Sequence, residues 1–237
     1  MYTKLKRLLF FCLCVVLCNA LQVSGQQADS TGRENYKWGQ VVVPSVLISY
    51  GVTSICNPKL MKLNEDIRFK LCGNEPYRRT RIDDYVQYAP GLMAIGLNIA
   101  GVKGKSKIQE LPVICLLSNV ILTSVVSSAK PLVHQKRPDG SGYSSFPSGH
   151  TAAAFAGAEL LYQEYKDRSV WYGIAGYTCA ATTGYFRMYN NRHSLADVLA
   201  GAGIGILSTK FAYFTYGKIK HALTKNKRES YAAGREL

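Results

Sequence analysis

Three short motifs between residues 130 and 197 combine cations, histidines and a carboxylate. They are Lys130 with Arg137 and Pro138; Pro147, Ser148, Gly149 and His150; and Arg187, His193 and Asp197. Only four histidines occur in the chain, and two of them stand in these motifs. Arginine offers a planar fork of donors and lysine a point charge, so the three cations suit the oxygens of a small tetrahedral anion. The residue types therefore indicate a phosphate site built around two histidines.

The spacing Lys-x6-Arg-Pro, Pro-Ser-Gly-His and Arg-x5-His-x3-Asp resembles the type 2 phosphatidic acid phosphatase (PAP2) family, which also contains acid phosphatases and vanadium haloperoxidases. The likeness spans Lys130 to Asp197 directly. Hydrophobic segments on either side fit the membrane branch of that family, so the resemblance covers most of the chain after about residue 40. One position departs from the pattern: the third motif usually opens with Ser-Arg, and Phe186 precedes Arg187 here. The change removes one hydroxyl but none of the charged or imidazole groups.

The resemblance implies a covalent mechanism in which His193 attacks phosphorus and forms a phosphohistidine. Such an intermediate splits one difficult step into two easier ones. Asp197 would hold one ring nitrogen of His193 and leave the other unprotonated and aimed at the substrate. His150 would protonate the leaving alkoxide and then activate water for the second step.

The resemblance also implies how the phosphate is held. Lys130, Arg137 and Arg187, with backbone N–H groups around Ser148 and Gly149, would neutralise charge on the equatorial oxygens. Fixed cations would then take the place that a magnesium ion has in other phosphatases. We therefore expect no metal and no other cofactor.

Each of these residues also has an ordinary structural interpretation. Ser194 and Asp197 fit a capping box at the start of the last helix, and Ser148 fits an N-cap before the alanine-rich helix. Lys130 fits an interfacial anchor beside an apolar run. The catalytic interpretation is preferred because about eight positions agree in order and spacing. Capping is compatible with it, since helix N-termini at both serines would direct positive dipole ends at the phosphate.

The chain of 237 residues is long enough for one domain with a sizeable core. Residues 1–25 resemble a secretory leader, with a basic start, an apolar run and small residues at its end; the alternative is an uncleaved signal anchor. We expect a polar linker over residues 26–40, the phosphatase domain over 41–217 and a basic tail over 218–237.

The net charge of +14 indicates an anionic partner. An export signal argues against nucleic acid, so anionic lipid headgroups are the preferred partner, and no protein partner is predicted. Cys56 and Cys72 flank one polar stretch and are candidates for a disulfide in an oxidising compartment. Cys115 and Cys179 lie in apolar segments as packing residues. No Cys/His spacing suggests zinc.

Six apolar segments with short connectors predict an all-α bundle of about six core helices without strands. The resemblance implies that this bundle is of the PAP2/haloperoxidase type. These segments are Val41–Cys56, Gln87–Val102, Leu111–Ala129, Thr151–Tyr162, Val170–Tyr185 and Leu195–Tyr216. Gly201, Gly203 and Gly205 in the last segment allow close approach of helices.

The polar stretch over residues 58–88 holds a second kind of helix. Leu60, Leu63, Ile67 and Leu71 recur there at helical spacing, which suits a helix lying along a membrane surface or one covering a soluble core. The cluster of Arg78, Arg79 and Arg81 that follows is a candidate site for a second phosphate, or simply solvated charge.

The topology that these segments imply contains a conflict. The positive-inside rule puts the Lys103–Lys107 connector and the basic tail in the cytoplasm, and both motif loops in the periplasm. Three spans after an exported N-terminus would reverse that orientation. Either Val41–Cys56 does not cross the membrane, or the helices form a soluble periplasmic bundle, as the mean hydropathy of −0.04 would suggest. We prefer a bundle embedded in the inner membrane.

We therefore expect an exported phosphoric monoester hydrolase that acts on a phosphorylated lipid. Among the substrates that the resemblance implies, the 1- or 4′-phosphate of lipid A is preferred, given the export signal, basic surface and small size. Undecaprenyl diphosphate and phosphatidylglycerol phosphate are alternatives, as is a soluble acid phosphatase of broad specificity. A haloperoxidase is disfavoured because the short chain shows no added domain, and a non-catalytic membrane protein because every charged and imidazole group of the motifs is present.

Overall fold

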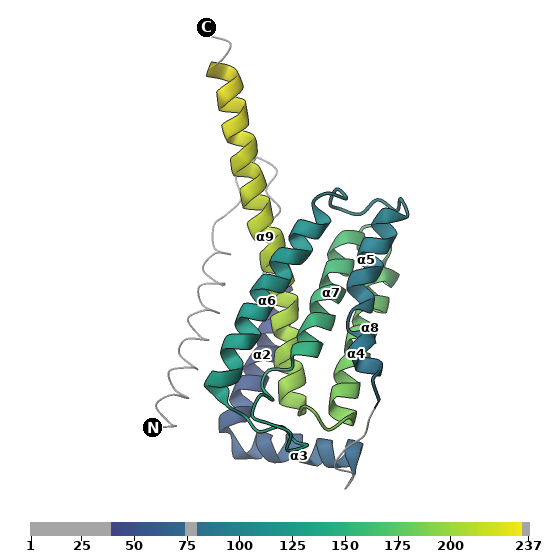
Figure 1. Cartoon of the computed structure of the whole chain (residues 1–237), viewed down its shortest axis with the longest axis vertical. Coiled ribbons are helices and arrows are strands. Elements are labelled where there is room, and N and C mark those ends of the chain that lie inside the picture. Colours follow the sequence, from purple (N-terminus) through teal and green to yellow (C-terminus); the bar gives the residue numbers. More distant parts are fainter. Residues whose placement is uncertain (1–38, 74–79, 234–237) are drawn as a thin grey trace.

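The structure is a computed structural model that describes residues 39–73 and 80–233. The predicted leader, most of the predicted linker, Arg78 and Arg79 lie outside these residues. Every regular element in the described part is a helix, in agreement with the all-α prediction (Figure 1). In chain order the helices are α2 (Gly39–Cys56), α3 (Pro58–Cys72), α4 (Ile82–Val86), α5 (Ala89–Ile99), α6 (Leu111–Val133), α7 (Gly149–Tyr165), α8 (Val170–Tyr189) and α9 (Leu195–Ala233).

The predicted second segment, Gln87–Val102, forms α5, and a short helix that was not predicted, α4, precedes it in the polar stretch. A turn at Gln87 and Tyr88 separates the short helix α4 from α5. Pro90 stands in the first turn of α5, where its missing N–H leaves no helical bond unmade, but the same residue cannot continue a helix from α4. The division matters for function because it gives α4 its own position at one end of the bundle.

Helix α9 is the centre of the bundle. Its residues 196–206 are buried apart from Leu199, and α7, α2 and α6 pack around it. A Cβ on Gly203 would stand 2.4 Å from the Pro44 carbonyl oxygen, and one on Gly205 would stand 2.2 Å from that of Ala152. These backbones touch only because glycine occupies both positions, which confirms the expected close approach of helices.

The outer faces of α2 and α6 carry large apolar side chains. Exposed residues of this kind are Val42, Val43 and Val46 of α2 and Val113, Leu116 and Val120 of α6. Three stretches in the described residues are long and apolar enough to cross a membrane: Gly39–Cys56, Leu111–Val133 and Leu195–Thr224. Helix α6 alone is about 35 Å long at 1.5 Å per residue, which exceeds the roughly 30 Å of a bilayer core. Apolar surface directed outward on spanning helices belongs in lipid, so the protein is a membrane protein.

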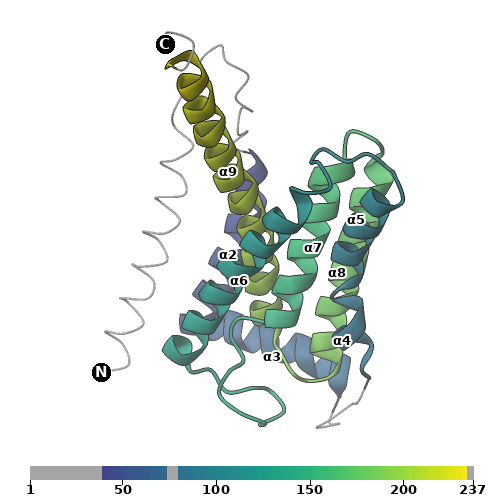
Figure 2. The same ribbon diagram turned by 45° about the horizontal axis from the view of Figure 1, so that its top comes forward.

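The two ends of the bundle differ. Helix α3 lies across one end, where the loop over residues 134–148 and the turn after α8 also lie (Figures 1 and 2). The connector over residues 100–110 and the protruding end of α9 lie at the other. The connector is fastened there by Ser106, whose N–H and Oγ donate to the Glu164 carboxylate at 2.8 and 2.7 Å. The lysine-rich connector is therefore opposite the motif loops.

The suggested disulfide between Cys56 and Cys72 is wrong. The two residues flank α3, whose fifteen residues extend about 22 Å, far beyond the span of a disulfide. The two sulfurs are not bonded to each other, and Cys72 Sγ instead donates to the Met188 carbonyl oxygen at 3.0 Å. This contact joins the end of α3 to the end of α8. The outer face of α3 exposes Met61 and Phe69, as expected of a surface helix.

Candidate active site

The site lies at the α3 end of the bundle, where the loop over residues 134–148 meets the ends of α4, α6, α7, α8 and α9. Helix α6 ends because His134 adopts a left-handed conformation with φ of 47°. In the following loop, Arg137 N–H donates to the Gly142 carbonyl at 2.8 Å and Ser145 N–H to that of Gln135 at 3.0 Å. These bonds return the chain to the start of α7. Helices α4, α8 and α9 provide the remaining sides.

His193 is held in a tight turn between α8 and α9. Asn191 has a positive φ of 55°, and the N–H groups of Arg192 and His193 both donate back to the Arg187 carbonyl. The imidazole is almost completely buried, with 1% of the residue exposed. The turn thus brings His193 beside the last turn of α8 and its Arg187.

Asp197 is fixed by several contacts in the first turn of α9. Its Oδ2 accepts from Ser145 Oγ and from Ser194 N–H, both at 2.7 Å, and its own N–H donates to Ser194 Oγ at 3.3 Å. The reciprocal pair with Ser194 is the predicted capping box. Oδ2 also lies 3.7 Å from His193 Nδ1. The carboxylate therefore faces Nδ1, which leaves Nε2 as the ring nitrogen for chemistry.

His193 Nδ1 and Asp197 Oδ1 are both buried and have no hydrogen-bond partner among the described residues. At 3.7 Å the gap between imidazole and carboxylate is longer than a hydrogen bond. Buried polar atoms without partners are rare. In this conformation the imidazole and the carboxylate therefore face each other without a hydrogen bond.

Arg187 is anchored by a carboxylate that the sequence motifs do not include. Its Nη1 donates to Asp83 Oδ2 of α4 at 2.7 Å, in a pair with side-chain exposures of 8% and 2%. Asn190 Nδ2 donates to the other oxygen of Asp83 at 2.9 Å and to the Thr80 carbonyl at 2.9 Å. These bonds fasten α4 to the end of α8. Arg187 Nε is buried without a partner in the described part of the chain, so the guanidinium keeps donor capacity for a ligand.

His150 stands in the first turn of α7 and faces the second carboxylate of α4. Its Nε2 lies 3.1 Å from Asp84 Oδ1, and both side chains are partly exposed. Burial lowers the pKa of His150, the charge of Arg187 lowers it further, and Asp84 opposes both effects.

Burial also lowers the pKa of His193, Asp197 opposes that shift, and Arg187 and Arg137 lower the pKa again. Arg187 is thus close enough to act on both imidazoles. A histidine with a lowered pKa is neutral at neutral pH, and a neutral imidazole can act as a nucleophile.

Lys130 and Arg137 complete the group of cations. Lys130 is in the last turn of α6, and the charges of Arg137, Arg187 and Asp197 act on it. Burial and the neighbouring guanidinium of Arg187 lower the pKa of Arg137, whose Nε is buried without a hydrogen-bond partner in the described residues. The three cations therefore converge on one region although they are up to 57 positions apart in the chain (187 minus 130).

Ser148 has a different place from the one that the motif suggests. Its N–H donates to the Asp197 carbonyl at 3.0 Å, and its Oγ pairs with Thr151 Oγ1 at 2.9 Å. It begins α7 without a side-chain cap bond. Gly149 follows in the first turn of α7, where N–H groups have no partner within the helix. Of this pair, the Gly149 N–H is the better donor for an anion.

Sequence reasoning missed Asp83 and Asp84, which contact Arg187 and His150 from 104 and 66 residues away. The only sequence signal was a pair of adjacent carboxylates directly before an apolar segment. The nearby Arg81 is exposed at the start of α4, and the second phosphate site suggested for the arginine cluster stays a prediction. Among the described residues, no group of three His, Cys, Asp or Glu side chains is placed to hold a metal ion.

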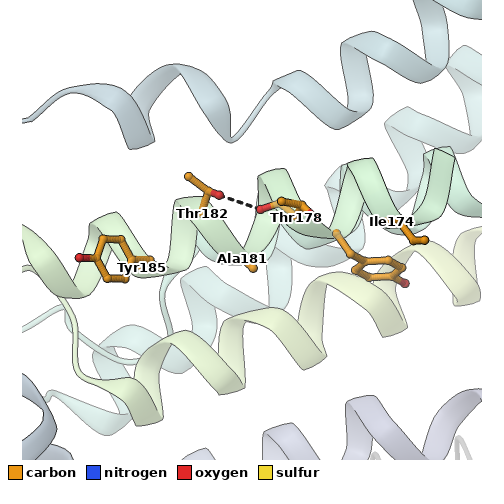
Figure 3. Close-up of a pocket in the computed structure, with 6 residues that line it drawn as sticks. Ile174, Thr178, Ala181, Thr182 and Tyr185 are labelled. Atoms are coloured by element: carbon orange, nitrogen blue, oxygen red, sulfur yellow. Dashed lines mark hydrogen bonds between the residues drawn. The ribbon is translucent and has the colours of Figure 1, made fainter. Parts of the chain in front are cut away.

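A shallow pocket of about 600 Å³ lies away from the histidines, on the outer face of α8 (Figure 3). Its lining repeats at helical spacing and consists of Ile174, Tyr177, Thr178, Ala181, Thr182 and Tyr185. Thr182 Oγ1 donates to the Thr178 carbonyl at 2.8 Å, which satisfies this hydroxyl within the helix. No residue of the three motifs lines this pocket.

Comparison with known proteins places these features in context. Residues 112–220 match the PAP2 superfamily. Over 150 residues the chain is 42% identical to a lipid A 1-phosphatase of Porphyromonas gingivalis, covering 63% of this chain and 33% of that protein. The chain thus spans about a third of the length of the curated relative that it matches.

Two solved structures are similar to this one. A transmembrane PAP2 type phosphatidylglycerolphosphate phosphatase from Bacillus subtilis has a TM-score of 0.53 and 20% identity, covering 75% of this chain and 97% of that chain. LpxE of Aquifex aeolicus has a TM-score of 0.49 and 24% identity, covering 64% of this chain and 94% of that one. The first likeness shows that the expected PAP2-type fold is present.

Proposed function

We propose that the protein is a lipid phosphate phosphatase that hydrolyses a phosphomonoester, a proposal supported by the match of residues 112–220 to the PAP2 superfamily. One observation carries the proposal: His193, His150 and three cations meet at one end of a membrane bundle, although they are widely separated in sequence. The group combines a buried neutral imidazole, a second imidazole with a carboxylate partner, and positive charge for the phosphate.

In the first step, Lys130, Arg137 and Arg187 bind the non-bridging oxygens of the substrate, with the Gly149 N–H. His193 Nε2 attacks phosphorus, so a P–N bond forms while the P–O bond to the lipid breaks. The leaving oxygen takes a proton from His150. Asp197 faces Nδ1 of His193 and stabilises the positive ring as the phosphohistidine forms.

In the second step, His150 is neutral and removes a proton from water. The water oxygen attacks phosphorus, the P–N bond breaks, and phosphate leaves while His193 returns to its neutral form. His150 regains the proton that it gave up in the first step, so the protons balance over the cycle. The lowered pKa of His193 supports this role because the ring is neutral before attack.

We propose the 1-phosphate of lipid A as the substrate. The support is the 42% identity to a lipid A 1-phosphatase over 150 residues, together with the membrane setting of the site. Phosphatidylglycerol phosphate, a phosphomonoester, and undecaprenyl diphosphate, a phosphoanhydride, also present a terminal phosphoryl group and are the comparison substrates. A soluble acid phosphatase is disfavoured by the three helices able to cross a membrane in the described part of the chain.

We further propose that the protein lies in the inner membrane with the site facing the periplasm. The support is the lysine-rich connector, including Lys103 and Lys107, at the end opposite the site. Helix α2 runs toward the site, so this orientation puts Gly39 at the cytoplasmic face. This orientation conflicts with the secretory leader expected over residues 1–25, because export of the residues that follow would put Gly39 at the periplasmic face.

The test uses the full chain in nanodiscs with lipid A, phosphatidylglycerol phosphate or undecaprenyl diphosphate. Mass spectrometry follows the loss of phosphate, and fragmentation distinguishes the 1- from the 4′-phosphate of lipid A. We expect loss of the 1-phosphate by the wild type and none by His193→Ala. Activity of His193→Ala equal to that of the wild type would overturn the mechanism. Preference for another lipid would overturn the substrate, and activity on p-nitrophenyl phosphate in a detergent-free extract would favour the soluble alternative.

A further inference from the structure

Helix α4 directs two adjacent carboxylates at two different groups of the site. Asp83 is buried and binds Arg187 Nη1 at 2.7 Å. Asp84 lies 3.1 Å from His150 Nε2 through its Oδ1. Since α4 has only five residues, the positions of these carboxylates depend on what holds the helix in place.

Several bonds fasten α4 to the end of α8 independently of Asp84. Asp83 accepts from Arg187 and Asn190, and Asn190 also binds the Thr80 backbone through its amide and carbonyl groups. On the other side, Gln87 Nε2 donates to the Asp84 carbonyl oxygen at 2.9 Å. The backbone of Asp84 is therefore held while half of its side chain is exposed. Its carboxylate can be replaced without opening a cavity.

The contact with Asp84 determines which nitrogen of His150 can react. A carboxylate accepts hydrogen bonds, so His150 Nε2 carries a proton and donates it to Asp84. Nδ1 is then the nitrogen left to exchange a proton with the substrate or with water. His193 has the opposite arrangement, because its Nδ1 faces Asp197 and its Nε2 is left for phosphorus.

We propose that Asp84 is a positioning residue for His150, which holds the imidazole with Nδ1 toward the leaving oxygen and stabilises its protonated form. The inference rests on the proposed function. In the first step, the P–O bond to the lipid breaks and the leaving oxygen takes the Nδ1 proton. In the second step, the same nitrogen takes a proton from water as the P–N bond breaks. Asp84 stays ionised throughout and accepts from Nε2 in both steps.

The charges around His150 support this role. Arg187 of α8 lowers the pKa of His150, as burial does, and Asp84 and Asp83 of α4 raise it. The cation that binds phosphate thus works against the protonated acid that the first step needs. Asp84, which contacts the His150 imidazole, raises the pKa of His150 and so opposes the effect of Arg187.

The test compares Asp84→Asn and Asp84→Glu with the wild type. Asp167→Asn is the matched control, since Asp167 is an exposed carboxylate beyond the other end of α7. Each protein, as the full chain in detergent, is assayed with p-nitrophenyl phosphate, whose leaving group departs without a proton, and with a short-chain alkyl phosphate, whose leaving group needs one. Values of kcat and KM are measured from pH 5 to 9, with thermal unfolding alongside.

For Asp84→Asn we expect kcat on the alkyl phosphate to fall by about 10- to 100-fold with little change in KM, a part of the 10²–10⁴-fold that general acid catalysis supplies. The fall on p-nitrophenyl phosphate should be only a few-fold. The basic limb of the kcat profile should move to lower pH, because the pKa of His150 falls when the carboxylate is removed. Asp84→Glu should recover part of the loss, and unfolding should be unchanged.

Equal losses on both substrates with an unshifted pH profile would overturn the proposal, as would an Asp84→Asn protein that behaves like Asp167→Asn. Each of these results leaves the proposed phosphatase function intact. A wild-type protein that hydrolyses neither these esters nor the lipids above would overturn the proposed function and this inference together.

Discussion

The carboxylate of Asp197 serves two structures at once, because the oxygen that lies 3.7 Å from His193 Nδ1 also accepts the Ser194 N–H at 2.7 Å. Asp197, which faces the candidate nucleophile His193, therefore also caps the first turn of helix α9. Its contribution to activity and its contribution to stability are separable only by measuring both.

Replacement of Asp197 by Asn tests this double role. We expect kcat to fall by about 10²- to 10⁴-fold, because the tautomer and orientation of His193 are no longer set. The folded state should lose about 1 kcal/mol with the capping contact. Ser194→Ala is the control, since it removes a capping hydroxyl and leaves the carboxylate. If Ser194→Ala lowers kcat as much as Asp197→Asn does, Asp197 acts through the cap alone.

The pH dependence of kcat/KM reports the free enzyme and so reads the pKa of His193. Attack needs the neutral ring, and burial with Arg187 and Arg137 lowers the pKa from its ordinary 6.5. Activity should therefore persist as the pH falls through 6.5. It should be lost only when the pH falls below the lowered pKa of His193. Arg137→Gln should raise the pKa of His193 and move this acid limb to higher pH. An acid limb above 6.5 in the wild type would contradict the assignment.

The buried pair of Asp83 and Arg187 predicts a large effect on stability. Asp83→Ala leaves a guanidinium buried without its counter-charge, which costs about 3–5 kcal/mol in proteins. Thermal unfolding in detergent should show a much lower midpoint for this variant. Asp84→Ala is the neighbouring control and should unfold close to the wild type. Similar midpoints for the two variants would mean that Asp83 does not hold Arg187.

The glycines of α9 predict where the bundle tolerates no side chain. A Cβ at Gly205 would stand 2.2 Å from the Ala152 carbonyl oxygen, whereas one at Gly217 would meet nothing within 4 Å. Gly205→Ala should therefore give little folded protein by size-exclusion chromatography. Gly217→Ala should fold as well as the wild type or gain up to about 1 kcal/mol from higher helix propensity. Normal yield of Gly205→Ala would show that the helices can separate.

The orientation in the membrane is testable through Cys56, which is exposed at the site end of α2. In spheroplasts, a membrane-impermeant maleimide should label a variant in which Cys56 is the sole cysteine. A Lys103→Cys variant without other cysteines should be labelled only after lysis, because the connector lies at the opposite end. The reversed pattern would place the site in the cytoplasm.

Much of this fold was predictable from sequence because the signals are local. Apolar runs bounded by polar connectors located six helices to within a few residues at most ends, and motif spacing identified the residues that converge from α6 to α9. Helix α9 was the exception. It continues to Ala233 through the predicted basic tail, since that tail contains neither glycine nor proline beyond Gly217 until Gly234.

What sequence could not supply were contacts between distant segments. Helix α4 is too short to show a period, so nothing indicated that Asp83 and Asp84 would face α8 and α7. The mistaken disulfide has a different cause. The helical period of Leu60, Leu63 and Ile67 lay between the two cysteines, and a straight helix holds the ends of a segment apart. The helical period of these residues and a disulfide between Cys56 and Cys72 therefore exclude each other.

The single helix from Leu195 to Ala233 also has a practical meaning for work with this protein. Its last turns project beyond the bundle on the side remote from both imidazoles (Figure 1). An affinity tag or a fluorescent protein fused at this end of α9 would lie on the side of the bundle opposite the site. Carboxy-terminal fusions are accordingly the preferred format for purification and for turnover assays.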